Sequence, residues 1–140
     1  MYRRAALGLL ALAASAAPLR LDLRDSTGQL HPSAELRSAR ATVFAFIAPP
    51  CPGSNGYLPE LNRIAPEHAP QGVRRSGGHS DPAVTAEAAR AHAARYGIAF
   101  PVLLDPEQRL ARAMEATRTL EVAVVLASSE RVYLGRVDDR

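Results

Sequence analysis

The sequence has 140 residues, with 17 arginine and lysine residues against 14 aspartate and glutamate residues and a formal net charge of +3. This length is sufficient for one domain with a hydrophobic core, but it is too short for two such domains. All the residues of the basic group are arginines, and only Arg3-Arg4 and Arg74-Arg75 are adjacent. Because a nucleic-acid-binding surface needs basic residues clustered on one face, we expect no nucleic-acid partner.

The N-terminal segment has the three parts of a secretory signal peptide. Arg3 and Arg4 precede a short apolar stretch at residues 5–13, and residues 14–16 (Ala-Ser-Ala) resemble a cleavage site. The stretch is shorter than the roughly 20 apolar residues that cross a membrane. We therefore expect residues 1–16 to be removed and residues 17–140 to be exported, to the periplasm or as a secreted protein, without a membrane span. An uncleaved N-terminal anchor is the alternative.

Two small elements are expected next. Residues 19–31 predict a β-hairpin, because apolar and polar residues alternate on both sides of the turn sequence at residues 25–28 (Asp-Ser-Thr-Gly). Residues 32–39 predict a short helical turn or a loop, with Ser33 as its N-cap.

The single cysteine of the sequence, Cys51, follows an apolar run at residues 42–48 that is rich in β-branched and aromatic side chains. This run is typical of a buried strand, and the prolines and glycine around Cys51 end it. Residues 56–69 repeat apolar side chains at helical spacing, so the thiol is expected at the start of a helix. Unpaired N–H groups and the helix dipole favour a reactive thiolate there. A thiol packed as a small hydrophobe is the alternative.

The segment that follows this helix departs from the usual pattern of a buried parallel strand. Residues 72–80 are polar and rich in glycine, whereas central parallel strands are almost continuously apolar. We therefore expect a poorly formed strand or a loop here, with reduced stability as the consequence. His79 would lie on the same rim as Cys51, either as a partner that handles a proton or as a solvated loop histidine.

An alanine-rich helix is predicted at residues 85–96, where Gly97 ends it and His92 is packed or exposed on it. No pair of histidine, aspartate or glutamate residues with ligand spacing is matched by a second pair. We therefore predict no metal site, and nothing in the sequence predicts a cofactor.

The remaining elements are a strand, a helix and a hairpin. Residues 100–104 predict the strand, and Asp105 is expected to cap a helix that runs to about Met114. Residues 122–126 and 131–135 predict two strands that a short turn joins into a hairpin.

The order of a strand, the sequence Pro-Cys-Pro-Gly-Ser, a helix with an internal proline and a further βα repeat resembles the thioredoxin-like superfamily. The resemblance is to redoxin domains related to peroxiredoxins and thiol-specific antioxidant proteins, and it covers most of the chain from Leu21 to Arg140. It implies an α/β fold, namely a three-layer α/β/α sandwich with a central mixed sheet and an N-terminal β-hairpin. We expect no counterpart of the C-terminal helix that usually completes this fold.

The resemblance also implies roles for three residues. Cys51 matches the first cysteine of the dithiol motif, or the peroxidatic cysteine of peroxiredoxins. Ser54 takes the second position of the dithiol motif, where its hydroxyl would donate a hydrogen bond to the thiolate. Arg118 precedes a strand, as does the arginine that steadies the thiolate and the peroxide in peroxiredoxins, and its permanent charge suits that role. A surface arginine is the alternative.

Three positions depart from the related families. Leu120 stands where thioredoxin-like proteins have a cis-proline, and Ala48 and Phe44 replace the hydroxyl residue and the proline that precede the cysteine of peroxiredoxins.

The resulting hypothesis is an exported thiol-dependent oxidoreductase that uses one cysteine for peroxide reduction or for thiol–disulfide exchange. Its substrate would be a peroxide or a protein thiol or disulfide, and an external thiol would be its reductant. A catalytically degenerate thioredoxin-like binding module is the first alternative. A metal chaperone that uses Cys51 and a histidine is the second.

Overall fold

The centre of the structure, a computed structural model that describes residues 19–138, is a five-stranded mixed sheet with the order β5-β4-β3-β6-β7. The expected signal peptide lies outside the described residues. The strands are β3 (Ala41–Phe46), β4 (Val73–His79), β5 (Val102–Leu104), β6 (Glu121–Leu126) and β7 (Arg131–Arg136). β3, β4 and β5 are parallel to one another, whereas β6 is antiparallel to β3 and β7 is antiparallel to β6.

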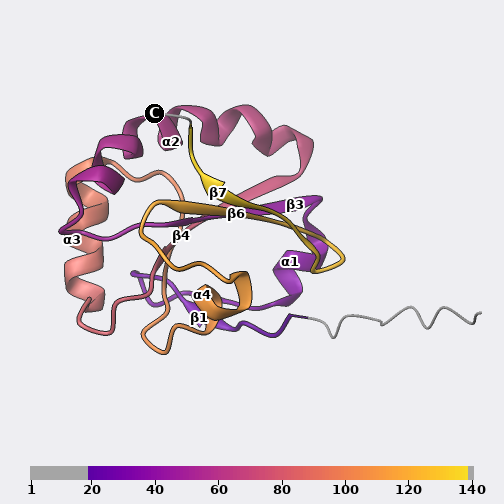
Figure 1. The fold of residues 1–140 in the computed structure, drawn as a ribbon, viewed down its shortest axis with the longest axis horizontal. Coiled ribbons are helices and arrows are strands. Elements are labelled where there is room, and N and C mark those ends of the chain that lie inside the picture. The colour runs from indigo at the N-terminus through magenta and orange to yellow at the C-terminus, as the bar shows by residue number, and fades with distance from the viewer. Residues whose placement is uncertain (1–18, 139–140) are drawn as a thin grey trace, which may run out of the picture.

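Helices cover both faces of this sheet (Figure 1). α2 (Pro52–His68) and α3 (Ala86–Tyr96) pack on one face, and η1 (Ala69–Gln71) follows α2. The other face is covered by α1 (Ala34–Ser38), α4 (Arg109–Met114) and a hairpin of β1 (Leu23–Arg24) and β2 (Leu30–His31). The arrangement confirms the α/β fold class, the mixed sheet and the N-terminal hairpin that were expected. None of the helices within residues 19–138 has the length and hydrophobicity needed to cross a bilayer.

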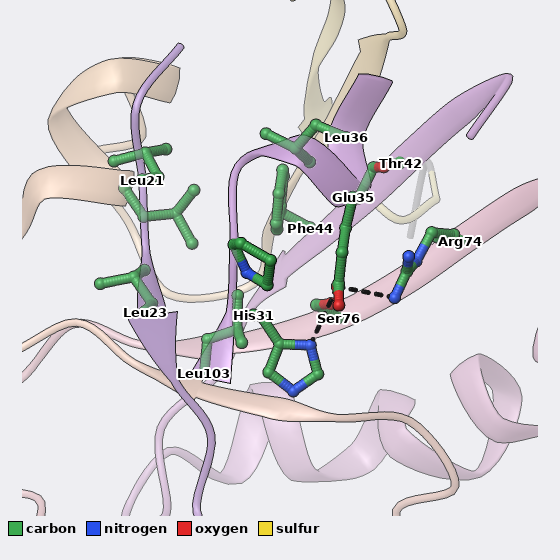
Figure 2. Close-up of a pocket in the computed structure, with 12 residues that line it drawn as sticks. Leu21, Leu23, His31, Glu35, Leu36, Thr42, Phe44, Arg74, Ser76 and Leu103 are labelled. Carbon is green, nitrogen blue, oxygen red and sulfur yellow. Dashed lines mark hydrogen bonds and ion pairs between the residues drawn. The ribbon is translucent and has the colours of Figure 1, made fainter. Parts of the chain in front are cut away.

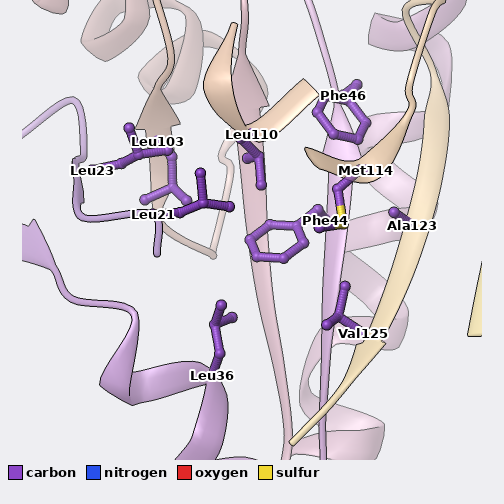
Figure 3. Close-up of a cluster of buried hydrophobic side chains, with 10 residues drawn as sticks. All are labelled: Leu21, Leu23, Leu36, Phe44, Phe46, Leu103, Leu110, Met114, Ala123 and Val125. Atoms are coloured by element: carbon purple, nitrogen blue, oxygen red, sulfur yellow. The ribbon is translucent and has the colours of Figure 1, made fainter. Parts of the chain in front are cut away.

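β3 supplies both hydrophobic cores, because successive side chains of a strand point to opposite faces of the sheet. Phe44 belongs to the core on the face with α1 and α4 (Figure 3), and Ala45 belongs to the core on the face with α2 and α3. The first core consists of Leu21, Leu23, Leu36, Phe44, Phe46, Leu103, Leu110, Met114, Ala123 and Val125. The second consists of Ala45, Ile47, Leu58, Leu61, Phe100, Val102 and Val122. The thiol-bearing loop therefore continues from the best-packed strand of the domain.

The prediction of a poorly formed strand or a loop at residues 72–80 is wrong. β4 is a seven-residue strand in the middle of the sheet, paired in parallel with β3 and β5. A Cβ atom on Gly77 would lie 3.1 Å from Ile47 and 3.2 Å from Phe100, so these two side chains already occupy the space beside the glycine. The last three residues of the strand, 77–79, are buried by apolar groups of its neighbours, which the polar sequence of β4 does not reveal.

Several predicted elements are confirmed close to their expected bounds. Thr85 caps α3 by accepting the N–H of Ala88 at 3.1 Å, and Gly97 ends it in the left-handed conformation with φ of 59°. The hairpin of β6 and β7 is also present. These elements depend on signals that lie within a few residues of one another, namely caps, turns and apolar alternation.

Two predicted caps are wrong. α4 begins at Arg109, later than expected, and its N-cap residue is Gln108 and not Asp105. The buried Asp105 carboxylate instead accepts the Ala111 N–H at 3.0 Å and the Ser80 hydroxyl at 3.2 Å, which ties the end of β4 to α4. Ser33 makes no side-chain cap to α1, since its hydroxyl accepts the N–H of Leu21.

Candidate active site around Cys51

Cys51 is the N-cap residue of α2, as the sequence predicted, and lies just beyond the end of β3. Its backbone is extended (φ −92°, ψ 106°), and Pro52 follows at the first helical position, where a proline sacrifices no helical hydrogen bond. The sulfur accepts the backbone N–H of Ser54, with an N···S distance of 3.5 Å. The half-buried thiol thus takes the capping role that a serine or aspartate oxygen usually has.

Ser54 contacts the Cys51 sulfur through its backbone N–H and not through its hydroxyl. The hydroxyl donates to the carbonyl oxygens of Ala48 and Cys51, both at 3.2 Å, and accepts the Ala48 N–H at 3.3 Å. The side chain is fully buried. The predicted contact between this hydroxyl and the sulfur is therefore absent from the geometry, and the hydroxyl closes the loop that carries the thiol instead.

Cys51 faces a groove of about 720 Å³ at the end of the sheet where β3 and β4 finish. Four separate parts of the chain line this groove: the loop after β3, the end of β4 with the residues that follow it, the start of α4, and residues 116–119 before β6. Arg118 is one of the lining residues. The structure therefore brings Cys51 and Arg118 to one groove.

The segment that carries Arg118 is held through its backbone. The N–H groups of Thr117 and Arg118 donate to one carboxylate oxygen of Glu121, at 2.6 and 3.0 Å. The Arg118 side chain is exposed, and among residues 19–138 its guanidinium has no hydrogen-bond or ion-pair partner. This leaves a fixed positive charge available to a ligand in the groove.

Leu120, which stands where thioredoxin-like proteins have a cis-proline, has a left-handed backbone with φ of 73°. No cis peptide bond occurs in the described part of the chain. The Leu120 N–H donates to the carbonyl oxygen of Phe46, the last residue of β3. A left-handed conformation is uncommon for a residue with a large side chain, and such residues often cluster near functional sites.

His79 is neither a solvated loop histidine nor a lining residue of the groove. It is the last residue of β4, its side chain is 1% exposed, and its Nδ1 donates to the carbonyl oxygen of Ile47 at 3.0 Å. Burial lowers the pKa of His79 to about 4, although the hydrogen bond to Ile47 raises it; the nearby His92 lowers it further. His79 is therefore neutral at pH 7 and contacts the backbone of the thiol-bearing loop from inside.

Asn55, which no sequence pattern singled out, also contacts the thiol-bearing loop through its side chain. Its Nδ2 donates to the carbonyl oxygen of Pro49 at 2.9 Å, and its backbone N–H donates to the carbonyl oxygen of Cys51 at 3.0 Å. His92, which is packed on α3, donates from Nε2 to Asn55 Oδ1 at 2.7 Å. Burial lowers the pKa of His92, and the charge of Arg95 lowers it further. Only the proximity of Asn55 to Cys51 in the sequence could have indicated this contact.

A second cavity lies on the face of the sheet that α1 and α4 cover (Figure 2), and it has a volume of only about 30 Å³. Glu35 at its edge pairs with Arg74 at 2.7 Å and with His31 at 3.2 Å, while apolar side chains such as Leu23 and Phe44 form its walls. A space of this size accommodates about one or two water molecules. Because it holds no thiol and no room for a substrate, it is not the candidate active site.

The described residues contain no group of three or more histidine, cysteine, aspartate or glutamate side chains that could hold a metal ion. The chemistry available at the groove is therefore that of one thiol, a backbone amide directed at its sulfur and a guanidinium. These groups suit nucleophilic attack by sulfur, because both donors stabilise negative charge.

Comparisons with known proteins agree with this fold. A hypothetical protein from Sinorhizobium meliloti 1021 is 30% identical, with a TM-score of 0.78 over 88% of this chain and 70% of that chain. Peroxidoxin BcpB from Mycobacterium tuberculosis is 20% identical, with a TM-score of 0.71 over 84% of this chain and 81% of its own. A secreted disulfide oxidoreductase from the same organism is 18% identical, with a TM-score of 0.69 over 86% of this chain and 85% of its own.

Curated protein sequences give no match to the chain. The sequence profile described as the AhpC/TSA family, in contrast, matches residues 14–131, which include β3, β4, β5 and β6 and end at the first residue of β7. The matched region also contains Cys51, Ser54 and Arg118. The chain therefore belongs to the AhpC/TSA family of thioredoxin-like redoxin domains.

Proposed function

We propose that the protein is an exported thiol-dependent oxidoreductase that uses Cys51 as its nucleophile. The observation that carries this proposal is the position of the sulfur at the N-terminus of α2, where it accepts the Ser54 N–H and faces the groove that Arg118 also lines. The amide and the guanidinium are both donors that stabilise negative charge developing on a reacting atom in the groove. Family membership supports thiol-dependent redox chemistry of this kind.

One reaction available to this site is peroxide reduction. The Cys51 thiolate attacks one peroxide oxygen, so that an S–O bond forms as the O–O bond breaks, and the leaving oxygen takes a proton to depart as water or an alcohol. Cys51 becomes a sulfenic acid, a two-electron oxidation that balances the reduction of the peroxide. An external thiol then displaces water to form a mixed disulfide, and a second external thiol releases Cys51.

The other available reaction is thiol–disulfide exchange. The Cys51 thiolate attacks one sulfur of a substrate disulfide, the old S–S bond breaks, and the second substrate sulfur leaves as a thiolate. Because the sequence has a single cysteine, an external thiol must resolve the mixed disulfide. A groove of about 720 Å³ offers room for a chain segment beside the thiol, which suits this reaction as well as an organic peroxide.

Arg118 and Ser54 have different roles in either reaction. The Arg118 guanidinium attracts the thiolate and the developing negative charge on the leaving oxygen or sulfur. Ser54 holds the loop between Ala48 and Cys51 closed, so that its own N–H stays directed at the sulfur.

Export is supported by the basic, apolar and small-residue parts of residues 1–16, and by the secreted disulfide oxidoreductase that shares the fold. Expression of the full chain in a bacterial host, followed by N-terminal sequencing of the periplasmic and culture fractions, tests this part. We expect a mature N-terminus at residue 17. Recovery of the intact chain in the membrane fraction would favour the uncleaved anchor.

The experiment that tests the function is mass spectrometry of the protein after mild peroxide treatment with a sulfenic-acid trap. We expect adducts on Cys51 in the folded protein, formed faster than in the urea-unfolded protein, and no adducts in Cys51→Ser. A parallel incubation with a glutathione disulfide tests exchange by the appearance of a mixed disulfide. If folded Cys51 reacts no faster than unfolded Cys51 in either assay, the alternative of a catalytically degenerate binding module is correct.

A further inference from the structure

We propose that Asn55 and His92, together with His79, are positioning residues that hold the Cys51-bearing loop from the buried side and thereby keep the thiol reactive. The loop is residues 47–51, between the end of β3 and the start of α2. This inference rests on the proposed function, because it concerns the reactivity of the same sulfur.

The hydrogen bonds of the loop show why it depends on these side chains. Its Ile47 carbonyl oxygen accepts His79 Nδ1, and its Pro49 carbonyl oxygen accepts Asn55 Nδ2. Both donors come from residues outside the loop, and one of them is itself oriented by His92. Two side-chain donors therefore hold the loop, in addition to the Ser54 hydroxyl that closes it from the helix. Two backbone hydrogen bonds also contribute, from the Ile47 N–H to the Gly78 carbonyl oxygen and from the Cys51 N–H to the Ala48 carbonyl oxygen.

The tautomers of the two histidines follow from these contacts. A carbonyl or amide oxygen can only accept, so the proton lies on Nδ1 of His79 and on Nε2 of His92. The other nitrogen of each ring, His79 Nε2 and His92 Nδ1, is buried without a hydrogen-bond partner among the described residues. The ring centroids are 5.3 Å apart. Each ring is thus arranged to be neutral and to donate in one direction only.

Protonation of either ring would disturb this arrangement. It would add a buried N–H without an acceptor and place a positive charge near the other ring. Within residues 19–138, no carboxylate forms an ion pair or hydrogen bond with either ring. Asp105 bonds to His79 only through its backbone N–H; its Oδ2 accepts from Ser80 and Ala111, and its Oδ1 is buried without a hydrogen-bond partner among these residues.

The groups around His92 also disfavour its protonation. The Tyr96 and His92 rings pack edge to face with their centroids 5.1 Å apart. The Asn55 side-chain oxygen already accepts the Nε2–H of His92. Arg95 brings a further positive charge, which lowers the pKa of His92 in the same direction as burial does. We therefore expect the loop to loosen as the pH falls below the range in which both rings are neutral.

Asn62 provides a matched control, because it is an asparagine of the same helix, α2. It also connects α2 to the end of α3, donating to the carbonyl oxygens of Tyr96 and Gly97 at 3.2 and 3.0 Å and accepting the Ala99 N–H at 3.0 Å. None of these side-chain hydrogen bonds reaches residues 47–51. Asn62→Ala therefore removes comparable hydrogen bonds between the same elements without touching the thiol-bearing loop.

The experiment measures the labelling rate of Cys51 by 4,4′-dipyridyl disulfide in the full chain at several pH values, alongside the unfolding free energy. At pH 7 we expect Asn55→Ala and His92→Leu to slow labelling by about fivefold, the factor that corresponds to roughly 1 kcal/mol, the scale of one hydrogen bond. Asn62→Ala should label at the wild-type rate even where it unfolds as easily as Asn55→Ala.

His92→Gln supplies the rescue, since its side-chain amide can donate to Asn55 but does not titrate. We expect a labelling rate near that of the wild type at pH 7. The ratio of the wild-type rate to the His92→Gln rate should then fall between pH 7 and pH 4.5, because only the wild-type side chain at position 92 takes up a proton, whereas His79 titrates in both proteins.

Two results would overturn the inference: labelling that tracks the unfolding free energy equally in Asn55→Ala and Asn62→Ala, or a ratio that does not change with pH. Nitrogen-15 spectra of the imidazole rings give an independent check, with an Nδ1–H tautomer expected for His79 and an Nε2–H tautomer for His92. Failure of peroxide oxidation with these labelling effects intact would refute the proposed function and leave the positioning role standing.

Discussion

The two faces of the central sheet are built differently, although β3 contributes to both. The face with α1 and α4 is an apolar core of leucine, phenylalanine and smaller side chains (Figure 3), and its ion pairs lie at its edge. The face with α2 and α3 contains two buried histidines beside its apolar core. The first face therefore contributes mainly apolar packing, and the second contributes directed hydrogen bonds near the thiol.

This difference shows how one small domain combines a stable scaffold with a reactive group. Apolar packing is not directional, whereas buried hydrogen bonds are costly to leave unmade and so specify one arrangement of the groups that they join. The hydrogen bonds of His79 and Asn55 end on the loop before Cys51. Mutations on the two faces should consequently have different effects on stability and on thiol reactivity.

The largest effect is expected for Leu110→Ala, on the apolar face. Leu110 is completely buried in the core that includes Phe44. Truncation removes buried methyl groups and leaves a cavity, so we expect a loss of about 2–5 kcal/mol in the unfolding free energy, measured by urea denaturation. The Cys51 labelling rate of the folded fraction should not change. If Leu110→Ala slows labelling as much as Asn55→Ala does, the two faces of the sheet do not differ in their effect on the thiol.

The next effect is the pH dependence of stability on the histidine face. His79 has a pKa of about 4 in the folded protein against 6.5 for an ordinary histidine, so the unfolded chain binds more protons between these values. Stability therefore falls as the pH drops from 6.5 to 4, by about 3 kcal/mol in total, and this residue contributes no slope above pH 6.5.

Urea denaturation at pH 7, 5.5 and 4.5 measures this slope, and His79→Gln is the comparison because its side chain does not titrate. We expect the wild-type protein to lose more stability than His79→Gln over this range. Equal slopes would mean that the burial of His79 does not disfavour its charged form.

A smaller effect is expected at the groove. Arg118→Ala removes a positive charge from the groove that Cys51 faces, and we expect the rate of Cys51 oxidation by peroxide to fall about tenfold, which corresponds to about 1.4 kcal/mol. The unfolding free energy should change by less than about 0.5 kcal/mol, because the side chain is exposed. Arg118→Lys should retain an intermediate rate, since it keeps the charge but not the planar fork. An unchanged rate in Arg118→Ala would identify a surface arginine.

The smallest effect is expected for Glu35→Gln, at the edge of the apolar face (Figure 2). The carboxylate pairs with Arg74 and His31, but the Glu35 and Arg74 side chains are 29% and 43% exposed. Exposed pairs contribute less than about 1 kcal/mol, and salt weakens them. Denaturation at low and high salt should show a small difference from the wild type that shrinks as salt is added. A large, salt-independent loss would mean that this pair is part of the core.

The junction of β3, Cys51 and α2 could be predicted because its signals are local. An apolar run, a proline after the cysteine and helical spacing beyond it are all contained in about 25 residues. Each of these signals indicates a backbone conformation directly, namely a strand, a helix start or a helix. The same holds for α3, whose cap residues Thr85 and Gly97 lie beside the helix that they delimit.

β4 and the positioning residues could not be predicted, because they depend on neighbours that are distant in the sequence. Gly77 is suited to the sheet only because Ile47 and Phe100 fill the space beside it. His92 and Asn55 meet only because α2 and α3 pack on the same face of the sheet. A single residue type, such as histidine on an alanine-rich helix, does not indicate which partner it will contact.

The sequence by itself determined the order of the elements other than β4, the family and the delivery of one thiol to a helix N-terminus, since turns, caps and apolar periodicity act over a few residues. Only the tertiary structure decided which groups surround that thiol. Arg118 enters the groove, the Ser54 amide and not its hydroxyl contacts the sulfur, and His79 lies inside. These outcomes depend on how the chain packs, because burial and hydrogen-bond partners are properties of the folded arrangement and not of any one segment.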